Sequence, residues 1–255
     1  MPPSNEFKMK ISTVTVCRNS QATIAQTIES FLHQSHSDKE MLVIDGGSTD
    51  KTLDIVRGFN DGSIRIISEE DRGIYDAMNK GLAHFSGDAV GFLNSDDVYH
   101  DRYALKRIAE ALDVADAAYG DLLMVSDHVV RTVVREWRAG AFEPCAFQSG
   151  WMPPHPTFYL KRKLAERTGK FDLSYRISAD YDFMLRALEL HYPRVSYIPH
   201  VLVDFMVGGM STTGLAAVVR GNLECLRARR RHLGTPLLDM ALFLKPLRKL
   251  RQLTK

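Results

Sequence analysis

Residues 41–50 read Met-Leu-Val-Ile-Asp-Gly-Gly-Ser-Thr-Asp, and this stretch decides the fold class. Its four consecutive apolar residues are typical of a strand that is buried on both faces, as parallel strands are. The polar turn at Asp45–Asp50 leads into apolar positions at Leu53, Ile55 and Val56, which predict a helix. A buried strand followed by a tight turn and a helix is the unit from which parallel α/β sheets are built.

The same unit recurs before and after this stretch. Apolar patterns predict strands at 11–16, 41–44, 64–67 and 89–93, and helices at 23–32, around 53–56 and at 74–85. Because strands and helices alternate at spacings of ~20–25 residues, they predict a doubly wound parallel sheet with covering helices. Beyond residue 100 we expect helices at 103–112 and 179–190 and short strands at 117–119, 122–125, 129–135, 195–198 and 201–205, the second and third of these strands forming a hairpin.

The composition of the 255 residues, with 45% apolar and 25% charged side chains, is that of a soluble globular chain. No apolar run approaches the ~18–20 residues that cross a bilayer, and the first residues lack the apolar segment of a signal peptide. The three cysteines, Cys17, Cys145 and Cys225, lie far apart, which argues against a disulfide framework or a cysteine zinc site. We therefore expect a cytoplasmic protein with one compact domain.

Charge is distributed unevenly along the chain. Residues 215–255 carry ten basic and two acidic side chains, a net charge of +8, whereas the other 214 residues carry 23 basic and 29 acidic ones. Basic residues at 227–231 and 245–251 are interleaved with apolar ones, which is typical of a helix in the interface of an anionic membrane. A helix packed on the body, or a contact in a homo-oligomer, is the alternative. The acidic body and the lack of a recognition motif argue against nucleic acid as a partner.

Polar side chains follow the predicted strands at the edge where open α/β sheets bind ligands. Asp45 follows one strand, and Asn94, Asp96 and Asp97 follow another. The glycine patterns of a phosphate loop and of a dinucleotide-binding fold are both absent. The neighbouring carboxylates Asp96 and Asp97 repel one another unless Mg²⁺ or Mn²⁺ neutralises them. A helix cap or an Asx turn is the structural alternative.

A third acidic group, Asp180 and Asp182, lies at the start of the helix predicted at 179–190. Acidic residues at this position often compensate the helix dipole. A general base held at the same edge as Asp45 and Asp96 is the functional alternative.

Motifs spread over about residues 10–210 resemble those of the inverting family 2 glycosyltransferases, which transfer a sugar from a nucleotide diphosphate. The resemblance implies the GT-A fold, a Rossmann-like, mostly parallel sheet flanked by helices, here with a basic helical C-terminal tail. The motifs are Thr15-Val-Cys-Arg-Asn19, Val43-Ile-Asp-Gly-Gly-Ser-Thr-Asp50, Glu70-Asp-Arg-Gly-Ile-Tyr-Asp-Ala-Met-Asn-Lys-Gly81, Phe92-Leu-Asn-Ser-Asp-Asp97, Ala118-Tyr-Gly-Asp121, His155-Pro-Thr-Phe158 and Ser178-Ala-Asp-Tyr-Asp182.

The resemblance implies a set of donor-binding residues. Asp45 would accept a hydrogen bond from the nucleobase, and Asp71 and Arg72 would hold the nucleotide, with the planar guanidinium of Arg72 suited to phosphate. The full implied set is Arg18, Asp45, Asp71, Arg72, Asn79, Asn94, Ser95 and His155.

The resemblance also implies a metal site and a general base. Asp96 matches the last acid of the family's Asp-x-Asp motif, with Asp97 beside it, so that both would bind Mn²⁺ or Mg²⁺; Asn94 stands where the first acid usually is. Asp180 matches the second acid of the Glu-Asp pair and would be the base, while Ala179 replaces the Glu. Trp151 would belong to a lid that packs on a sugar.

The implied reaction transfers a sugar, with inversion, to a hydroxyl of a glycan or of a polyprenyl- or lipid-linked acceptor in cell-envelope polysaccharide or glycolipid biosynthesis. Residues 1–100 would form the half that binds the nucleotide-sugar and 101–214 the half that binds the acceptor, with the tail at 215–255 on the inner face of the cell membrane. Two alternatives are a catalytically silent nucleotide-sugar-binding protein, which Asn94 and Ala179 permit, and a sugar kinase of the actin-like fold, in which Asp45–Thr49 would be a phosphate loop.

Overall fold

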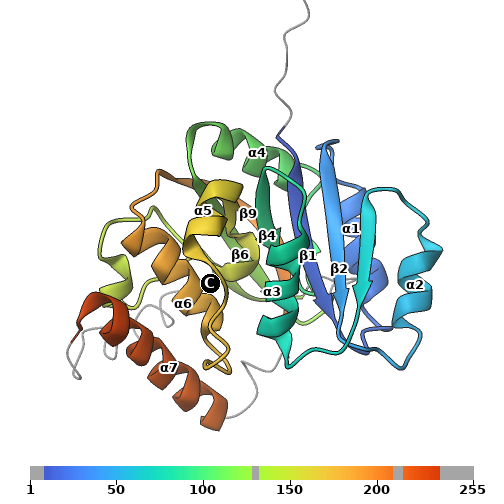
Figure 1. Ribbon diagram of the computed structural model, residues 1–255. Coiled ribbons are helices and arrows are strands. Elements are labelled where there is room, and N and C mark those ends of the chain that lie inside the picture. Colours follow the sequence, from blue (N-terminus) through green and yellow to red (C-terminus); the bar gives the residue numbers. More distant parts are fainter. Residues whose placement is uncertain (1–8, 128–131, 209–214, 236–255) are drawn as a thin grey trace, which may run out of the picture.

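Figure 1 shows a computed structural model of the protein, in which residues 9–127, 132–208 and 215–235 are described. This part of the chain forms a nine-stranded sheet in the order β3-β2-β1-β4-β8-β6-β9-β5, with β7 paired to β6. The strands are β1 (Ile11–Cys17), β2 (Lys39–Asp45), β3 (Ile64–Ser68), β4 (Ala89–Phe92), β5 (Val98–Tyr99), β6 (Ala117–Val125), β7 (Val133–Trp137), β8 (Tyr159–Lys161) and β9 (Val195–Met206). The helices are α1 (Ile24–Leu32), α2 (Thr52–Gly58), α3 (Ile74–His84), α4 (Ala104–Val114), α5 (Arg162–Thr168), α6 (Ala179–Leu185) and α7 (Leu215–Leu233).

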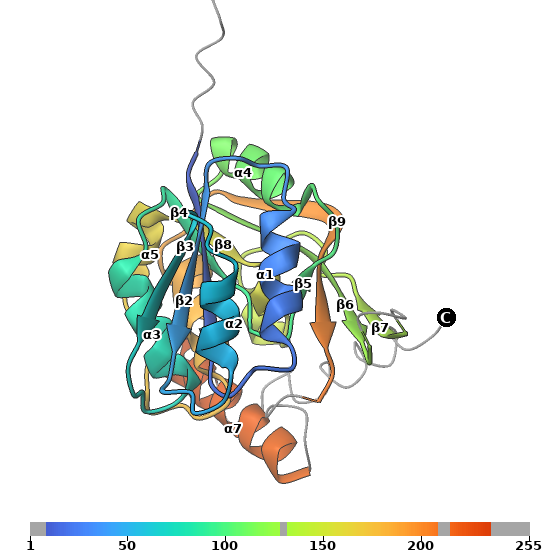
Figure 2. The same ribbon diagram turned by 90° about the vertical axis from the view of Figure 1, so that its right-hand side faces the viewer.

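The first half is parallel, as the alternation of strands and helices predicts. Strands β3, β2, β1 and β4 pair in parallel, and Cys17 at the end of β1 lies opposite Asp45 at the end of β2. Side chains of β2 enter two cores: Leu42 and Ile44 pack on the side of α3, and Met41 and Val43 on the side of α1. Figure 2 shows α3 on one side of these strands and α1 and α2 on the other. Burial on both faces explains the uninterrupted apolar run.

The second half departs from the predicted elements. The two strands expected at 117–119 and 122–125 are one strand, β6, and those at 195–198 and 201–205 are one strand, β9. Their register shifts between Gly120 and Leu122, where Pro199 and His200 lie outside the paired positions. This bulge breaks the alternation of apolar residues that marks a strand. The expected hairpin is confirmed, since β6 and β7 pair antiparallel.

Three short elements, β5, β8 and α5, have no counterpart in the prediction. Strand β8 has three residues and pairs antiparallel with both β4 and β6, so it joins the parallel half to the second half. Strands of two or three residues, such as β5 and β8, are too short to show a hydrophobic period, and α5 covers only about two helical turns. None of the described helices is long and apolar enough to cross a membrane.

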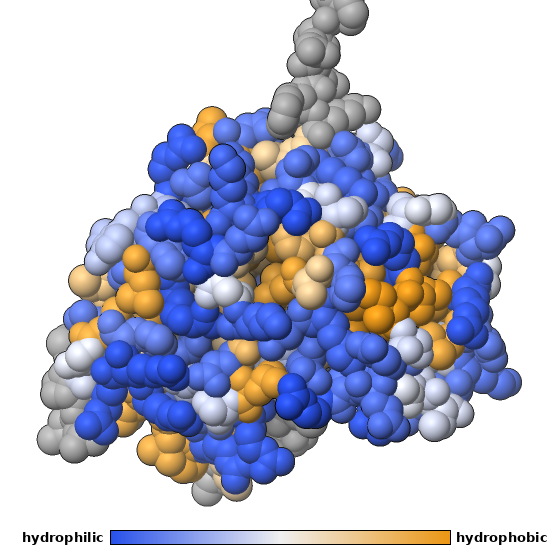
Figure 3. Space-filling model, viewed as in Figure 1, coloured by the Kyte–Doolittle hydropathy of each residue, from blue (hydrophilic) through white to orange (hydrophobic). Residues whose placement is uncertain are grey.

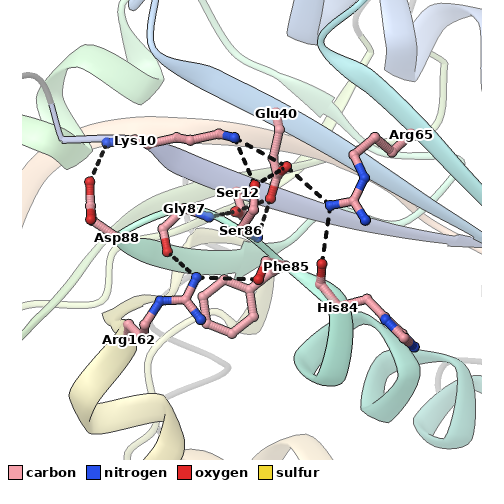
Figure 4. A network of polar contacts seen from close by, with 10 residues as sticks. All are labelled: Lys10, Ser12, Glu40, Arg65, His84, Phe85, Ser86, Gly87, Asp88 and Arg162. Carbon is pink, nitrogen blue, oxygen red and sulfur yellow. Dashed lines mark hydrogen bonds and ion pairs between the residues drawn. The ribbon is translucent and has the colours of Figure 1, made fainter.

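A buried carboxylate, Glu40, organises the edge of the sheet opposite the Asp45 turn (Figure 4). It accepts hydrogen bonds from the Ser12 hydroxyl at 2.6 Å and from the Ser86 hydroxyl and N–H, both at 2.5 Å. Lys10 Nζ and Arg65 Nη1 lie 3.4 and 3.5 Å away. Burial alone would raise the pKa of Glu40, but the hydrogen bonds from Ser12 and Ser86 outweigh it and lower the pKa to about 2.

Replacing Glu40 with Gln should therefore lower the free energy of unfolding in a pH-dependent way. A carboxyl whose pKa falls from 4.5 to about 2 on folding contributes about 3 kcal/mol above pH 4.5, and this is lost as the pH falls towards 2. Urea denaturation from pH 7 to pH 3 should show the two proteins converging at low pH. The exposed Glu110→Gln is the control. If the difference in the free energy of unfolding between wild type and Glu40→Gln does not become smaller as the pH falls, the lowered pKa of Glu40 is contradicted.

Candidate active site

The loops that follow β1, β2 and β4 meet at one edge of the sheet. The Asn19 N–H donates to Ser48 Oγ at 2.8 Å, which ties the first loop to the second. The Ser20 N–H donates to Thr52 Oγ1 at 2.8 Å, and the Ser20 and Ser95 hydroxyls lie 2.9 Å apart, which ties in the third. The edge is therefore a connected rim, as the position of the polar motifs after parallel strands predicts.

Asp45 is fully buried at this rim and holds the turn that follows it. Its carboxylate accepts hydrogen bonds from Ser68 Oγ at 2.7 Å and from the N–H groups of Gly47 and Ser48 at 3.1–3.2 Å. Burial opposes ionisation, but these hydrogen bonds outweigh it, so the pKa of Asp45 is lowered. Burial and the Asp45 charge together raise the pKa of Cys17 to about 12. Asp45 thus has no exposed surface with which to contact a nucleobase.

Asp71 lies directly beside the Asp45 turn. A Cβ at Gly46 would overlap the Asp71 carboxylate and displace it, so glycine at this position lets the carboxylate pack against the turn. Asp71 also accepts the Gly73 N–H at 2.9 Å and is partly exposed. Arg72 points to Asp76 at 3.4 Å with a side chain that is 80% exposed, and Arg18 is exposed in the loop after β1.

The turn at Asn94–Asp97 separates its two carboxyl groups. The Asp97 carboxyl is fully buried and accepts hydrogen bonds from Asn94 Nδ2 and from the Met206 N–H, both at 3.0 Å. Burial and the neighbouring Asp96 charge raise the pKa of Asp97 well above its ordinary value. Both Asp97 oxygens therefore face the protein interior, which differs from the expected pair of metal ligands. Asp96 is the partly exposed member of the pair.

A divalent cation fits this rim only if it shares ligands with a substrate. No group of three or more His, Cys, Asp or Glu side chains in the described residues could hold a metal by itself. Mg²⁺ and Mn²⁺ commonly bind through one or two carboxylates together with substrate phosphates. Asp96 meets that requirement as a single carboxylate, and a nucleotide diphosphate would supply the other oxygens.

Asp180 lies in the first turn of α6, next to α3. The Tyr75 hydroxyl, on α3, lies 3.3 Å from Asp180 Oδ1 and donates to the Ile177 carbonyl at 2.5 Å. Burial and the Asp180 charge raise the pKa of Tyr75 well above its ordinary value, so Tyr75 stays a neutral phenol. Asp180 is partly exposed and therefore able to meet a substrate.

His155 packs against the end of β4, close enough to Asp180 for that charge to affect its pKa. Its ring is buried and stacks on Phe92 with centroids 5.4 Å apart. Burial lowers the pKa of His155, and the negative charge of Asp180 partly opposes this shift. Its Nε2 finds no hydrogen-bond partner among the described residues. A buried, unpartnered ring nitrogen is costly, so it points to a bound ligand.

Asn79 and Trp151 have contacts other than those expected. The Asn79 amide is buried and bonds both backbone groups of Phe171, at 2.8 and 3.0 Å, so it holds the segment before α6 instead of facing a donor. Trp151 Nε1 donates to the Ala139 carbonyl at 2.8 Å. Its ring packs against three aromatic rings at 5.5–5.7 Å, those of Phe142, Phe147 and Tyr119.

The first part of the basic tail packs on the body. Helix α7 lies along α6 (Figure 1), and the buried Arg229 donates to the Tyr181 hydroxyl at 3.0 Å. His232 Nε2 lies 2.9 Å from Asp182 Oδ1. Packing on the body, one of the alternatives for the tail, therefore holds for this face of α7. Residues 236–255 lie outside the described residues.

Residues 12–177 match the sequence profile of the family described as Glycosyl transferase family 2. The chain belongs to this family. The protein is therefore a glycosyltransferase, and the sugar-kinase alternative is wrong.

Two relatives from mycobacteria resemble this glycosyltransferase over most of their length. A protein named "PGL/p-HBAD biosynthesis glycosyltransferase" from Mycobacterium bovis BCG is 32% identical over 214 residues, 81% of this chain and 79% of the relative. An uncharacterized glycosyltransferase of Mycobacterium tuberculosis is 31% identical over 224 residues, 84% of this chain and 81% of the relative.

Solved structures show the same fold. The TarS 1–349 structure from S. aureus has a TM-score of 0.67 and 19% identity, covering 91% of this chain and 68% of that one. The mannosyltransferase PcManGT from Pyrobaculum calidifontis, in complex with GDP-Man and Mn²⁺, has a TM-score of 0.66 and 20% identity, covering 96% and 71%. The GT-A fold expected for this glycosyltransferase is thus confirmed.

Proposed function

We propose that this glycosyltransferase moves a sugar from a nucleotide diphosphate to a hydroxyl of a lipid-linked or glycan acceptor, with inversion at the sugar C1. The observation that carries the proposal is the buried His155 Nε2, which finds no hydrogen-bond partner among the described residues. The His155 ring stacks on Phe92 at the end of β4, just before the Asp96 loop, and is close enough to Asp180 for that charge to affect its pKa. Two structural neighbours were solved in complex with a nucleotide-sugar, TarS with UDP-GlcNAc and PcManGT with GDP-Man, which supports a nucleotide-sugar donor.

The donor nucleotide is expected along the Asp45 turn. Because Asp45 is buried, we assign the contact with the nucleobase to Asp71, which occupies the space beside Gly46 and is partly exposed. The diphosphate would then lie over the Asn94–Asp97 turn, within reach of Asp96 and of the His155 ring nitrogen. A divalent cation held there would neutralise the charge that develops on the leaving diphosphate.

Asp180 is assigned the role of general base. In an inverting transfer the acceptor hydroxyl loses its proton as it attacks C1 from the face opposite the leaving group, and a carboxylate within hydrogen-bond reach takes that proton. Tyr75 stays neutral beside Asp180, so it does not compete as a second base.

Donor hydrolysis separates this function from a catalytically silent binding protein. We expect at least one of UDP-glucose, UDP-GlcNAc and GDP-mannose, with Mn²⁺, to raise the melting temperature and to release nucleoside diphosphate slowly in water. A melting shift without release would show a silent binding protein. Neither effect with any diphospho-sugar would contradict the proposal.

The acceptor is proposed to be presented at an anionic membrane surface on the cytoplasmic side. The mycobacterial relative named for PGL/p-HBAD biosynthesis supports a glycolipid product. The outward face of α7 exposes Val219 and Leu223, at 50% and 60%, beside the exposed Arg220 and Arg230. Figure 3 shows apolar side chains next to strongly hydrophilic ones over α7, at the lower left. Apolar and cationic groups together match a lipid surface, and basic and apolar residues continue through 236–255.

Reversing two arginines of this face should weaken binding to anionic vesicles. Each arginine contributes about 1 kcal/mol near such a surface, so Arg220→Glu with Arg230→Glu should lower partitioning onto phosphatidylglycerol vesicles at least about tenfold. Cosedimentation measures this, with the exposed Arg57→Glu on α2 as control. If the double variant binds the vesicles as wild type does, α7 is not the membrane-binding surface. Loss of binding only on deletion of 236–255 would assign it to the terminal segment.

A further inference from the structure

The segment before the proposed base is held by a carboxylate from a distant helix. Glu224, on α7, accepts hydrogen bonds from three consecutive backbone N–H groups, those of Arg176 at 3.1 Å and of Ile177 and Ser178 at 2.9 Å. The Ser178 hydroxyl donates to the Gly221 carbonyl of α7 at 3.1 Å. These groups lie two to four residues before Asp180, so α7 fixes the backbone from which the base projects.

The position of Glu224 is electrostatically favourable. The first N–H groups of a helix lack partners within the helix and carry the positive end of its dipole. The Ser178 side chain does not cap α6, because its hydroxyl bonds to α7. The Glu224 carboxylate supplies negative charge at this end of α6, while its hydrogen bonds hold the three N–H groups of residues 176–178 that lead into the helix.

Helix α3 holds the same segment from the other side. Ile177 is held through both of its backbone groups: its N–H donates to Glu224, and its carbonyl accepts a hydrogen bond from the Tyr75 hydroxyl. Asn79, one turn further along α3, holds Phe171. Residues 171–178 are thus clamped between α3 and α7.

A second contact of α7 follows the base. Asp182 is buried and pairs with Arg186 Nε at 2.8 Å and with His232 Nε2 of α7 at 2.9 Å. Helix α7 therefore contacts the chain on both sides of Asp180, before it through Glu224 and after it through His232.

We propose that Glu224 is a positioning residue for the general base, and that α7 serves as the strut that holds Asp180 in place for catalysis. The proposal rests on the function proposed above. Misplacement of a reacting group by about 1 Å costs about a hundredfold in rate, so loss of the three N–H contacts should slow turnover without weakening donor binding.

The test compares Glu224→Gln with wild type in donor hydrolysis, using the diphospho-sugar that wild type hydrolyses. Gln removes the charge and keeps one acceptor oxygen, but places an amide N–H group against at least one of the three backbone N–H groups. We therefore expect kcat to fall at least about tenfold while the donor KM stays within about twofold. The exposed Glu166→Gln on α5 makes the same chemical change as control. Glu224→Asp, which keeps the charge, should recover part of kcat. If Glu224→Gln does not fold, Ser178→Ala decides, with an expected drop in kcat of about threefold at unchanged KM.

A double variant tells positioning from an independent role. If Glu224 acts through Asp180, adding Glu224→Gln to Asp180→Asn should slow turnover no further. The proposal would be overturned if the two substitutions multiply their effects on kcat in the double variant. It would also be overturned if Glu224→Gln alone raises KM at unchanged kcat, or has the kinetics of wild type. If Asp180→Asn alone leaves turnover unchanged, the proposed function fails instead.

Discussion

Asp180→Asn should reduce kcat at least about a hundredfold while the donor Kd stays within about twofold of wild type. The amide keeps the shape of the carboxyl and the contact with Tyr75, but it cannot take a proton from the attacking hydroxyl. Because the acid lies at the start of α6 and not on the Asp45 turn, the nucleotide should still bind.

The measurement pairs calorimetric binding of the donor with steady-state hydrolysis or transfer. Asp54→Asn, an exposed acid on α2, is the matched control and should behave as wild type. Turnover by Asp180→Asn at the wild-type rate would remove Asp180 from the mechanism. Loss of donor binding together with turnover would mean that Asp180 holds the donor.

Asp96→Ala should abolish the dependence of activity on Mn²⁺, whereas Asp97→Asn should keep it. The contrast follows from burial: both Asp97 oxygens accept hydrogen bonds inside the protein, and Asn keeps the size and shape of that side chain. Asp96 is partly exposed, and we assign to it the role of sharing a cation with a diphosphate.

Titrating Mn²⁺ into chelator-treated protein measures this contrast in the hydrolysis assay. Wild type and Asp97→Asn should respond to Mn²⁺, and Asp96→Ala should lose at least about a hundredfold in the activity that Mn²⁺ elicits. Wild-type activity in chelator equal to that in Mn²⁺ would contradict the metal proposal. If Asp97→Asn loses the response to Mn²⁺ and Asp96→Ala keeps it, the cation binds to Asp97 instead.

The parallel half of the fold could be predicted from the sequence because its signals are local. Residues 41–44 are buried on both faces, and the run shows this directly. The second half could not be read the same way. Strand β9 is interrupted at Pro199 and His200 by a bulge opposite Gly120, and β8 has three residues. In both places pairing with distant strands determines the structure, and the pattern along the chain is weak.

The candidate site was predicted as a set of polar turns after the strands. In the structure some of the predicted residues form hydrogen bonds inside the protein instead of facing a ligand. Asn79 bonds Phe171, 92 residues away, and Asp97 bonds Met206, 109 residues away. Such contacts leave no periodic trace in one sequence. Glu224 could not be predicted for the same reason: its three partners, residues 176–178, lie 46–48 residues before it, and the basic stretch around it carries no sign of them.

A structure of the protein with a nucleoside diphosphate and Mn²⁺ would test the central claim most directly. The base should lie beside Asp71 and the Gly46 backbone, the cation should contact Asp96, and the terminal phosphate should lie near His155 with Asp180 across an open space of one sugar ring. A nucleotide bound away from the loops after β1, β2 and β4, or one whose terminal phosphate points away from Asp180, would contradict it.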